Sequence, residues 1–285
     1  MCRSLFLAFR WTHLDFESLY QQNPRPVKAG GEAYKDFSET LSVRDNVEYD
    51  PNSTLHVSFD FNVNPYLPVG IFQVKGYEFL DPITGKLIKE FEVFKIKEFT
   101  MVTPLNTTRA ACQMVAKEYD NHRAGMHIYG DPNGFKEDTR SEKGHNDFTI
   151  IKQELRKFNP RLNIFSVAPS VKMRIEFMNN LFAGNIGGLK YFIDSRCTVT
   201  IDDYRYLKEA PDGTKFKEKM IDRMTGRTAE RYGHMTDLDE YFICHLFNKA
   251  YQFYIRGGIS APIKQVLRQS RHSAMIGSNR RVNSY

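Results

Sequence analysis

Cysteine is scarce in this 285-residue chain, and its spacing argues against two kinds of small, cross-linked fold. The four cysteines, Cys2, Cys112, Cys197 and Cys244, lie far apart, and no CxxC pair occurs. Zinc sites and disulfide frameworks use closely spaced or dense cysteines, so we expect neither here. The pattern is typical of a protein that works in a reducing cytosol.

Long apolar runs are also missing from the sequence. No run of 18 or more apolar residues occurs, so we expect no membrane-spanning helix. The first ten residues hold a short apolar run without a cleavage site of small residues, so we expect no secretory signal. No GxxxxGK[ST] loop occurs either, and ATP hydrolysis through a Walker A loop is therefore excluded. The 41% of hydrophobic residues suffice for the core of one large domain or two small ones.

The net charge of +6 comes from one end of the chain. Residues 256–285 contain six Lys and Arg and no Asp or Glu, whereas the rest of the chain has equal numbers of basic and acidic residues. A basic tail of this kind contacts an anionic partner or is simply solvated.

Hydrophobic periodicity predicts a mixed α/β fold. Three strands at about 55–62, 68–75 and 88–99 have short connections, which predicts an antiparallel meander. Helices and short strands then alternate, which predicts parallel strands with crossover helices. The expected elements are helices at 106–124, 145–158, 172–182 and 237–255 and strands at 126–131, 162–167 and 188–193. A densely charged stretch at 202–233 is expected to be an exposed excursion, and residues 1–50 a lead-in.

Three aspartates stand at the ends of these expected elements. Asp60 ends the first strand, Asp131 follows a short parallel strand, and Asp237 begins the last helix, three residues after His234. Each has a simpler interpretation alone: Asp60 and Asp131 as turn residues, Asp237 as a helix N-terminal charge, and His234 as a cap or surface residue. Together they are expected at the carboxyl edge of one sheet. Convergent carboxylates repel unless a cation lies between them, and hard oxygen ligands suit Mg²⁺ or Mn²⁺.

Three short motifs give these positions a resemblance to a known family. Phe59-Asp-Phe-Asn-Val-Asn-Pro, then Tyr-Gly-Asp-Pro-Asn-Gly at 129–134, then His-Met-Thr-Asp-Leu-Asp-Glu-Tyr-Phe at 234–242 resemble the nuclease domain of the large terminase subunit of tailed bacteriophages. The resemblance implies a ribonuclease-H-like α/β fold. Its central sheet would have five or more strands, three antiparallel strands followed by parallel β-α units, with helices on both faces. It also implies a lead-in at 1–50 like the end of a terminase ATPase domain, a nuclease domain at 51–255 and a tail at 256–285.

The resemblance implies a metal-dependent endonuclease that cuts concatemeric double-stranded DNA during phage genome packaging. Asp60, Asp131 and Asp237 would hold two Mg²⁺ or Mn²⁺ ions, and His234 would assist as a ligand or orienter. The charged stretch would contact phosphates through Lys215, Lys217, Lys219, Arg223, Arg227 and Arg231. The implied partners are the portal protein, the small terminase subunit and a separate ATPase motor domain, in the cytoplasm of a bacterial host and away from any membrane.

Other interpretations remain open at this point. The ribonuclease-H-like fold that the resemblance implies is shared with resolvases and integrases, so a resolvase or a nuclease of RNA–DNA hybrids is an alternative. A non-catalytic packaging or portal-docking module that kept the fold is a second. Since a Walker A loop is missing, either the motor is encoded elsewhere or the chain is a fragment of a longer protein.

Overall fold

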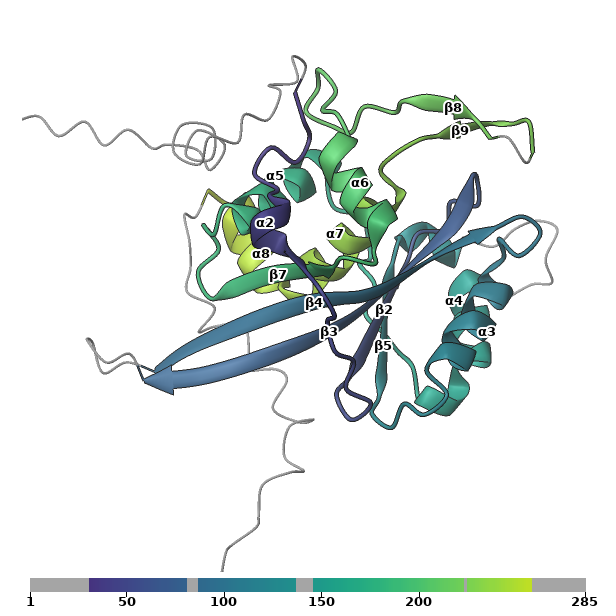
Figure 1. Ribbon diagram of the computed structural model, residues 1–285, viewed down its shortest axis with the longest axis horizontal. Coiled ribbons are helices and arrows are strands. Elements are labelled where there is room, and N and C mark those ends of the chain that lie inside the picture. Colours follow the sequence, from purple (N-terminus) through teal and green to yellow (C-terminus); the bar gives the residue numbers. More distant parts are fainter. Residues whose placement is uncertain (1–30, 81–86, 137–145, 223–224, 258–285) are drawn as a thin grey trace, which may run out of the picture.

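The strands of the computed structural model, which describes residues 31–80, 87–136, 146–222 and 225–257, build one large sheet and one small hairpin. Within these residues, the large sheet has seven strands in the order β1-β7-β4-β3-β2-β5-β6 (Figure 1). These strands are β1 Val43–Arg44, β2 Leu55–Phe59, β3 Tyr66–Leu80, β4 Leu87–Val102, β5 Met126–Gly130, β6 Arg161–Leu162 and β7 Leu189–Asp194. The hairpin pairs β8 Lys219–Ile221 with β9 Thr228–Glu230.

The pairing within the sheet confirms the predicted fold class. β2, β3 and β4 form the antiparallel meander. β5 then adds parallel to β2, and β6 parallel to β5. β7 returns to the other side of the meander and pairs parallel with β4, and β1 pairs parallel with β7 at the edge. The sheet therefore has the mixed topology expected of a ribonuclease-H-like α/β fold.

The four predicted helical regions are helical, with changes at their ends, and α2 and α6 are additional helices that the sequence did not predict. They are α2 Glu39–Ser42, α3 Thr108–Glu118, α4 Asp147–Glu154, α5 Val171–Phe182, α6 Thr198–Tyr206, α7 His234–Leu246 and α8 Asn248–Ile255. Two short 3₁₀ helices, η1 Pro132–Phe135 and η2 Arg156–Phe158, follow β5 and α4. The single helix predicted at 237–255 is broken at Phe247, so that prediction is corrected to two helices. The strand predicted at 162–167 ends at Leu162.

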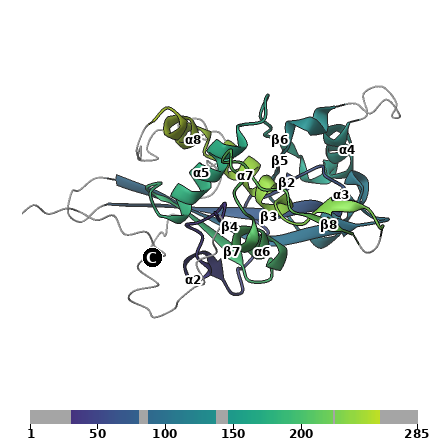
Figure 2. The same ribbon diagram turned by 90° about the horizontal axis from the view of Figure 1, so that it is seen from above.

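Helices cover both faces of the sheet, as predicted. Successive residues of a strand point to opposite faces. Ile71 and Ile128 pack into a core with α3 and α4, whereas their neighbours Phe72 and Tyr129 pack into a second core with α5, α6 and α7. In the second core, α7 crosses the middle of the sheet and contacts β2, β3 and β5, while α5 and α6 lie on either side of it (Figure 2). No helix in the described ranges is long and apolar enough to cross a membrane.

Two segments that were predicted to lie outside the folded body are partly buried in it. Residues 32–44 of the expected lead-in belong to the folded body, because Tyr34 and Phe37 are buried in the second core and β1 extends the sheet. The boundary predicted at residue 51 therefore falls inside the fold. The charged stretch 202–233 starts inside the body too, since Asp203 and Tyr204 of α6 are buried.

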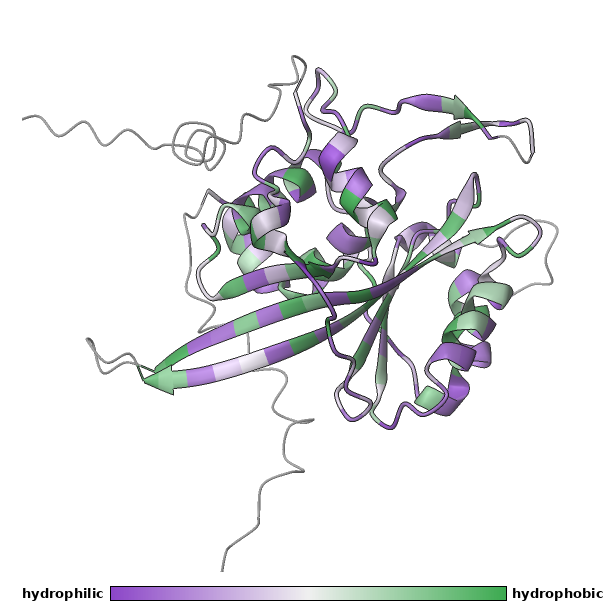
Figure 3. Ribbon diagram, in the orientation of Figure 1, coloured by the Kyte–Doolittle hydropathy of each residue, from purple (hydrophilic) through white to green (hydrophobic). Residues whose placement is uncertain are grey.

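The parts that do project from the body are two β-ribbons. The β8–β9 hairpin stands away from the helices beside the sheet (Figure 1). The far ends of β3 and β4 extend as a long ribbon along which hydrophobic and hydrophilic residues alternate (Figure 3). The segments 1–30, 81–86, 137–145 and 258–285, which include most of the basic tail, lie outside the described residues.

Candidate functional site

Asp60 and Asp131 leave the sheet at the same edge because their strands pair in register. Phe59, the last residue of β2, lies opposite Gly130, the last residue of β5, and an aspartate directly follows each of them. The backbone N–H of Asp131 donates a hydrogen bond to the carbonyl of Phe59, with an N···O distance of 3.4 Å. Gly130 permits this approach: its φ is +155°, and a Cβ there would lie 2.5 Å from the carbonyl oxygen of Phe59.

Helix α7 carries Asp237 to the same edge. The hydroxyl of Ser58 on β2 donates to the carbonyl of Leu238 at 2.7 Å. Gly70 on β3 leaves room for Leu238, since a Cβ at Gly70 would lie 2.4 Å from its Cδ1 atom. Asp203 of α6 accepts a hydrogen bond from the backbone N–H of Met235 at 2.9 Å. An acceptor at a helix N-terminus satisfies a free donor there, so these contacts fix the first turn of α7.

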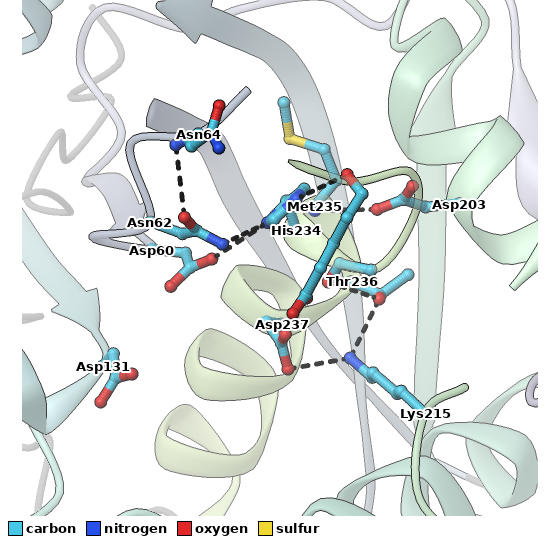
Figure 4. Close-up of polar contacts among 12 residues, drawn as sticks. Asp60, Asn62, Asn64, Asp131, Asp203, Lys215, His234, Met235, Thr236 and Asp237 are labelled. Carbon is cyan, nitrogen blue, oxygen red and sulfur yellow. Dashed lines mark hydrogen bonds and ion pairs between the residues drawn. The ribbon is translucent and has the colours of Figure 1, made fainter. Parts of the chain in front are cut away.

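The four residues that the sequence singled out line one cavity of about 320 Å³. Figure 4 shows the carboxylates of Asp60, Asp131 and Asp237 around the same space, with His234 beside Asp60. The cavity is lined by Asp60, Phe61, Asn62, Asp131, Asn133, Lys217, Glu230, His234 and Asp237. Residues with carboxylate or amide side chains therefore make up most of its wall.

His234 lies within the site rather than on the surface. Its side chain is only 2% exposed, and the N-cap of α7 is Gly233, so His234 is neither a surface residue nor the cap. Its Nδ1 atom lies 3.7 Å from Oδ2 of Asp60 and 3.3 Å from the amide nitrogen of Asn62. Nε2 lies 3.2 Å from the carbonyl oxygen of Glu230.

Asp60 and His234 change each other's pKa. Burial raises the pKa of Asp60, the contact with His234 opposes this rise, and the charges of Asp237 and Asp131 add to it. Burial lowers the pKa of His234, but the contact with Asp60 and the charge of Asp203 outweigh it, so the net shift is upward. Burial and the neighbouring carboxylates thus disfavour the ionised form of Asp60, which a nearby cation would favour.

Asp237 is held by two cations. Lys215 Nζ and Arg174 Nη2 lie 2.9 Å and 3.1 Å from its Oδ1 atom. Burial raises the pKa of Asp237, but the charges of Lys215 and Arg174 outweigh it and lower the pKa overall. Asp237 therefore stays ionised.

Asp131 also serves the turn that follows it. Its side chain accepts hydrogen bonds from the backbone N–H of Asn133 at 2.8 Å and from the side-chain amide of Asn133 at 3.0 Å. These bonds cap η1. The turn-forming interpretation of Asp131 is thus correct locally, and the same bonds fix the carboxylate at the cavity.

The donor set fits a hard divalent cation. Mg²⁺ and Mn²⁺ prefer carboxylate, carbonyl and water oxygens, and the cavity presents three aspartates with two asparagine side chains beside them. Within the described residues, no three His, Cys, Asp or Glu side chains lie close enough together to hold one ion as they stand. Asp237 is bound to cations and Asp131 to Asn133, so the carboxylates are turned to protein partners.

The residues predicted to contact phosphates have different environments. Lys215 is 7% exposed in its side chain and bound to Asp237 and Glu240, so the structure places it in the site rather than on a DNA-facing surface. Lys217 and Arg231 are exposed but ion-paired with Glu230 and Glu218. The remaining predicted contacts are Lys219 and Arg227, which are exposed on or beside the β8–β9 hairpin, and Arg223, which lies outside the described residues.

Several residues of the site were not singled out by sequence. Glu240 lies three residues after Asp237 on α7, and that helical spacing was a usable signal. Arg174 and Asp203 come from α5 and α6, and no local pattern connects them with Asp237. Their roles depend on tertiary packing.

The fold and the site define an α/β protein of the ribonuclease-H-like class with acidic residues at the carboxyl edge of its central strands. No family model and no curated protein matches the chain. Among solved structures, it is similar to the large terminase from a thermophilic bacteriophage, with 14% sequence identity and a TM-score of 0.48, over 75% of this chain and 45% of that one. It is also similar to the P22 large terminase nuclease domain, with 11% identity and a TM-score of 0.45, over 84% and 98% of the two chains.

The chain spans less than half the length of the thermophilic-phage terminase structures that it matches.

Proposed function

We propose that this protein is a divalent-metal-dependent endonuclease that cuts concatemeric double-stranded DNA in phage genome packaging. Asp60, Asp131 and Asp237 would hold two Mg²⁺ or Mn²⁺ ions, with His234 orienting Asp60. When bound, such ions activate a water molecule and stabilise the leaving oxygen of a phosphodiester.

One observation carries the proposal. The three aspartates come from residues 60, 131 and 237, and the fold places all of them on one oxygen-lined cavity. A purely structural role does not require this convergence, because turn and helix-end aspartates are satisfied by their own backbone. The protein's part in the reaction is to fix these carboxylates in position. Lys215 and Arg174 do this for Asp237.

The positive charges on and beside the β8–β9 hairpin favour a polyanionic substrate. Lys217, at the base of the hairpin, lines the cavity, while Lys219 and Arg227 are exposed further along it. Contacts of lysine and arginine with phosphates are independent of sequence. The duplex would therefore lie along the hairpin, with one strand at the cavity.

The test is cleavage of plasmid DNA by the purified chain with Mg²⁺ or Mn²⁺. Asp60→Asn and Asp237→Asn should each abolish cleavage while circular dichroism shows an intact fold, and a chelator should stop the wild-type protein reversibly. Cleavage at the wild-type rate by Asp60→Asn would rule out this site. Asp212→Asn, on an exposed turn, serves as a matched control that should cut normally.

The same assay separates the alternatives. Preference for a four-way junction or an RNA–DNA hybrid over concatemeric duplex would indicate another ribonuclease-H-like nuclease. Metal binding without cleavage under any divalent ion would indicate a non-catalytic packaging module. The portal protein, the small terminase subunit and a separate ATPase motor are further proposed partners. The basic tail, whose deletion would test portal docking against DNA contact, lies almost wholly outside the described residues.

A further inference from the structure

Lys215 is bound to three acceptors on the first turns of α7. Its Nζ atom lies 3.0 Å from Oγ1 of Thr236, 2.9 Å from Oδ1 of Asp237 and 3.0 Å from Oε2 of Glu240. An ammonium group has three N–H donors, and all three are used here. Lys215 is therefore held in place rather than mobile.

Arg174, together with Lys215, Asp237 and Glu240, forms a layer of two positively and two negatively charged side chains. Its side chain is 2% exposed and lies over the ring of Tyr241 at 4.3 Å. Nη2 pairs with Asp237, while Nε lies 3.2 Å from Oε2 of Glu240, within ion-pair distance but without hydrogen-bond geometry. Tyr34 donates a hydrogen bond to the other oxygen of Glu240. Two cations thus face two carboxylates, of which Glu240 is fully buried and Asp237 is partly exposed.

Both cations contact the same oxygen of Asp237. Lys215 and Arg174 approach Oδ1, and the side chain of Asp237 is 31% exposed along the cavity wall. With Oδ1 fixed from behind, rotation of the carboxylate is restricted, and Oδ2 is the atom left for a ligand in the cavity. This arrangement pre-orients a metal ligand in the way that outer partners do in other metal sites.

We infer that Lys215 is a positioning residue that prepares Asp237 to bind a divalent cation, an inference that rests on the proposed function. The alternative is that Lys215 competes with the metal ion for Asp237. In that role the lysine occupies the cation position and must leave when the metal binds. The burial of Lys215 and its bond to Glu240 favour positioning, because departure would leave Glu240 with one cation fewer in a buried layer.

The two roles predict effects of opposite sign on metal affinity. Removing a positive charge near a cation site strengthens cation binding if only Coulomb repulsion matters. Loss of a positioning partner weakens binding instead, typically by about 10- to 100-fold. Lys217 is a matched control, since it lines the cavity and carries the same charge but pairs with Glu230 and not with Asp237.

The experiment measures Mn²⁺ affinity of the full chain by isothermal titration calorimetry, without DNA. Lys215→Met should bind Mn²⁺ about 10- to 100-fold more weakly than wild type. Lys215→Arg, which keeps the charge, should recover most of that loss. Lys217→Met should bind Mn²⁺ as tightly as wild type or more tightly. Binding by Lys215→Met that equals or exceeds wild type would overturn the inference, and tighter binding would identify Lys215 as a competitor.

Lys215→Met leaves Glu240 with one buried cation fewer, which puts the folding of this variant at risk. The double variant Lys215→Met/Glu240→Gln restores the charge balance and keeps Arg174 on Asp237, so its Mn²⁺ affinity decides the question if the single variant does not fold. It should still bind weakly, and wild-type affinity would again overturn the inference. Failure of the proposed function has a different signature: either wild type does not bind Mn²⁺, or Asp60→Asn binds it unchanged.

Discussion

Nδ1 of His234 lies 3.7 Å from Oδ2 of Asp60, and each group shifts the pKa of the other. The contact joins the first turn of α7 to the end of β2. It places the imidazole ring of His234 next to the carboxylate of Asp60. His234 is therefore suited to hold Asp60 in one orientation.

We predict that His234→Ala lowers DNA cleavage by about 10- to 100-fold without abolishing it, as expected for a partner of a metal ligand. Single-turnover cleavage of a plasmid at several pH values measures the effect. His122→Ala is the control for loss of a part-buried histidine, because His122 bonds Tyr49 away from the cavity. Wild-type rates for His234→Ala at every pH would reduce His234 to a packing role.

A second prediction concerns the backbone between the two strand aspartates. A Cβ at Gly130 would lie 2.5 Å from the carbonyl oxygen of Phe59, and its φ of +155° disfavours other residues. Gly130→Ala should cost about 1–3 kcal/mol of unfolding free energy, the scale of local backbone strain, and should displace Asp131. Urea denaturation measures the first effect and cleavage the second.

Gly125, at the other end of β5, provides the comparison. A Cβ there meets no atom within 4 Å. Gly125→Ala should leave both stability and cleavage close to wild type. Equal effects of the two substitutions would mean that the close approach at Gly130 does not matter.

The central strands, and the places of Asp60, Asp131 and Asp237 at the ends of their elements, were predictable because they depend on local patterns. The alternation of Leu55, Val57 and Phe59 predicts β2, and the aspartates follow strands or begin a helix. Asp203 and Arg174 were not predictable, since each acts on α7 from a distant helix. Lys215 was expected on a DNA-facing surface because a charged stretch is usually solvated. The buried partners Asp237 and Glu240 override that tendency.

The break between α7 and α8 at Phe247 and the burial of the N-terminal segment around Tyr34 were both missed by the sequence analysis. The helical pattern continues through residues 237–255, but α7 ends at Leu246, next to Phe247, which is buried in the second core with its ring 5.9 Å from that of Phe91. Tyr34 lies in a segment that resembles a linker, yet it supports Glu240 from across the core. Tertiary contacts of this kind leave no periodic signal in the sequence.

A third prediction concerns the β8–β9 hairpin. Lys219 and Arg227 are exposed, and in the described part of the chain no carboxylate lies within ion-pair distance of either. Lys217 and Arg231 already pair with Glu230 and Glu218. Alanine at Lys219 or Arg227 should flatten the salt dependence of duplex binding by up to about 0.9 log unit per lost phosphate contact. Alanine at Lys217 or Arg231 should have a smaller effect.

Duplex affinity at several salt concentrations, with Ca²⁺ in place of Mg²⁺ to prevent cleavage, measures these slopes. The sequence of the duplex should not matter, because the contacts are to phosphates. An unchanged slope for all four variants would place the DNA elsewhere on the molecule. Equal losses for all four would mean that the ion pairs open when DNA binds.

The last prediction concerns Asp203, which holds the N-terminus of α7. Burial raises the pKa of Asp203 from 3.8 to about 6, and hydrogen bonds from Gly233 and Met235 only partly oppose it. The folded state therefore binds a proton more readily than the unfolded state does. The stability that this adds is fully present below pH 3.8 and is lost as pH rises through about 6.

Asp203→Asn removes this titration and keeps an oxygen that accepts the Met235 N–H. Relative to wild type, the variant should gain up to about 3 kcal/mol between pH 4 and pH 7, at ~1.4 kcal/mol per pKa unit. Urea denaturation with a chelator present measures the difference at each pH. Asp212→Asn should show the opposite sign, because bonds from Thr214 lower the pKa of Asp212 in the folded state. A pH-independent difference for Asp203→Asn would mean that Asp203 ionises as easily in the folded protein as in the unfolded chain.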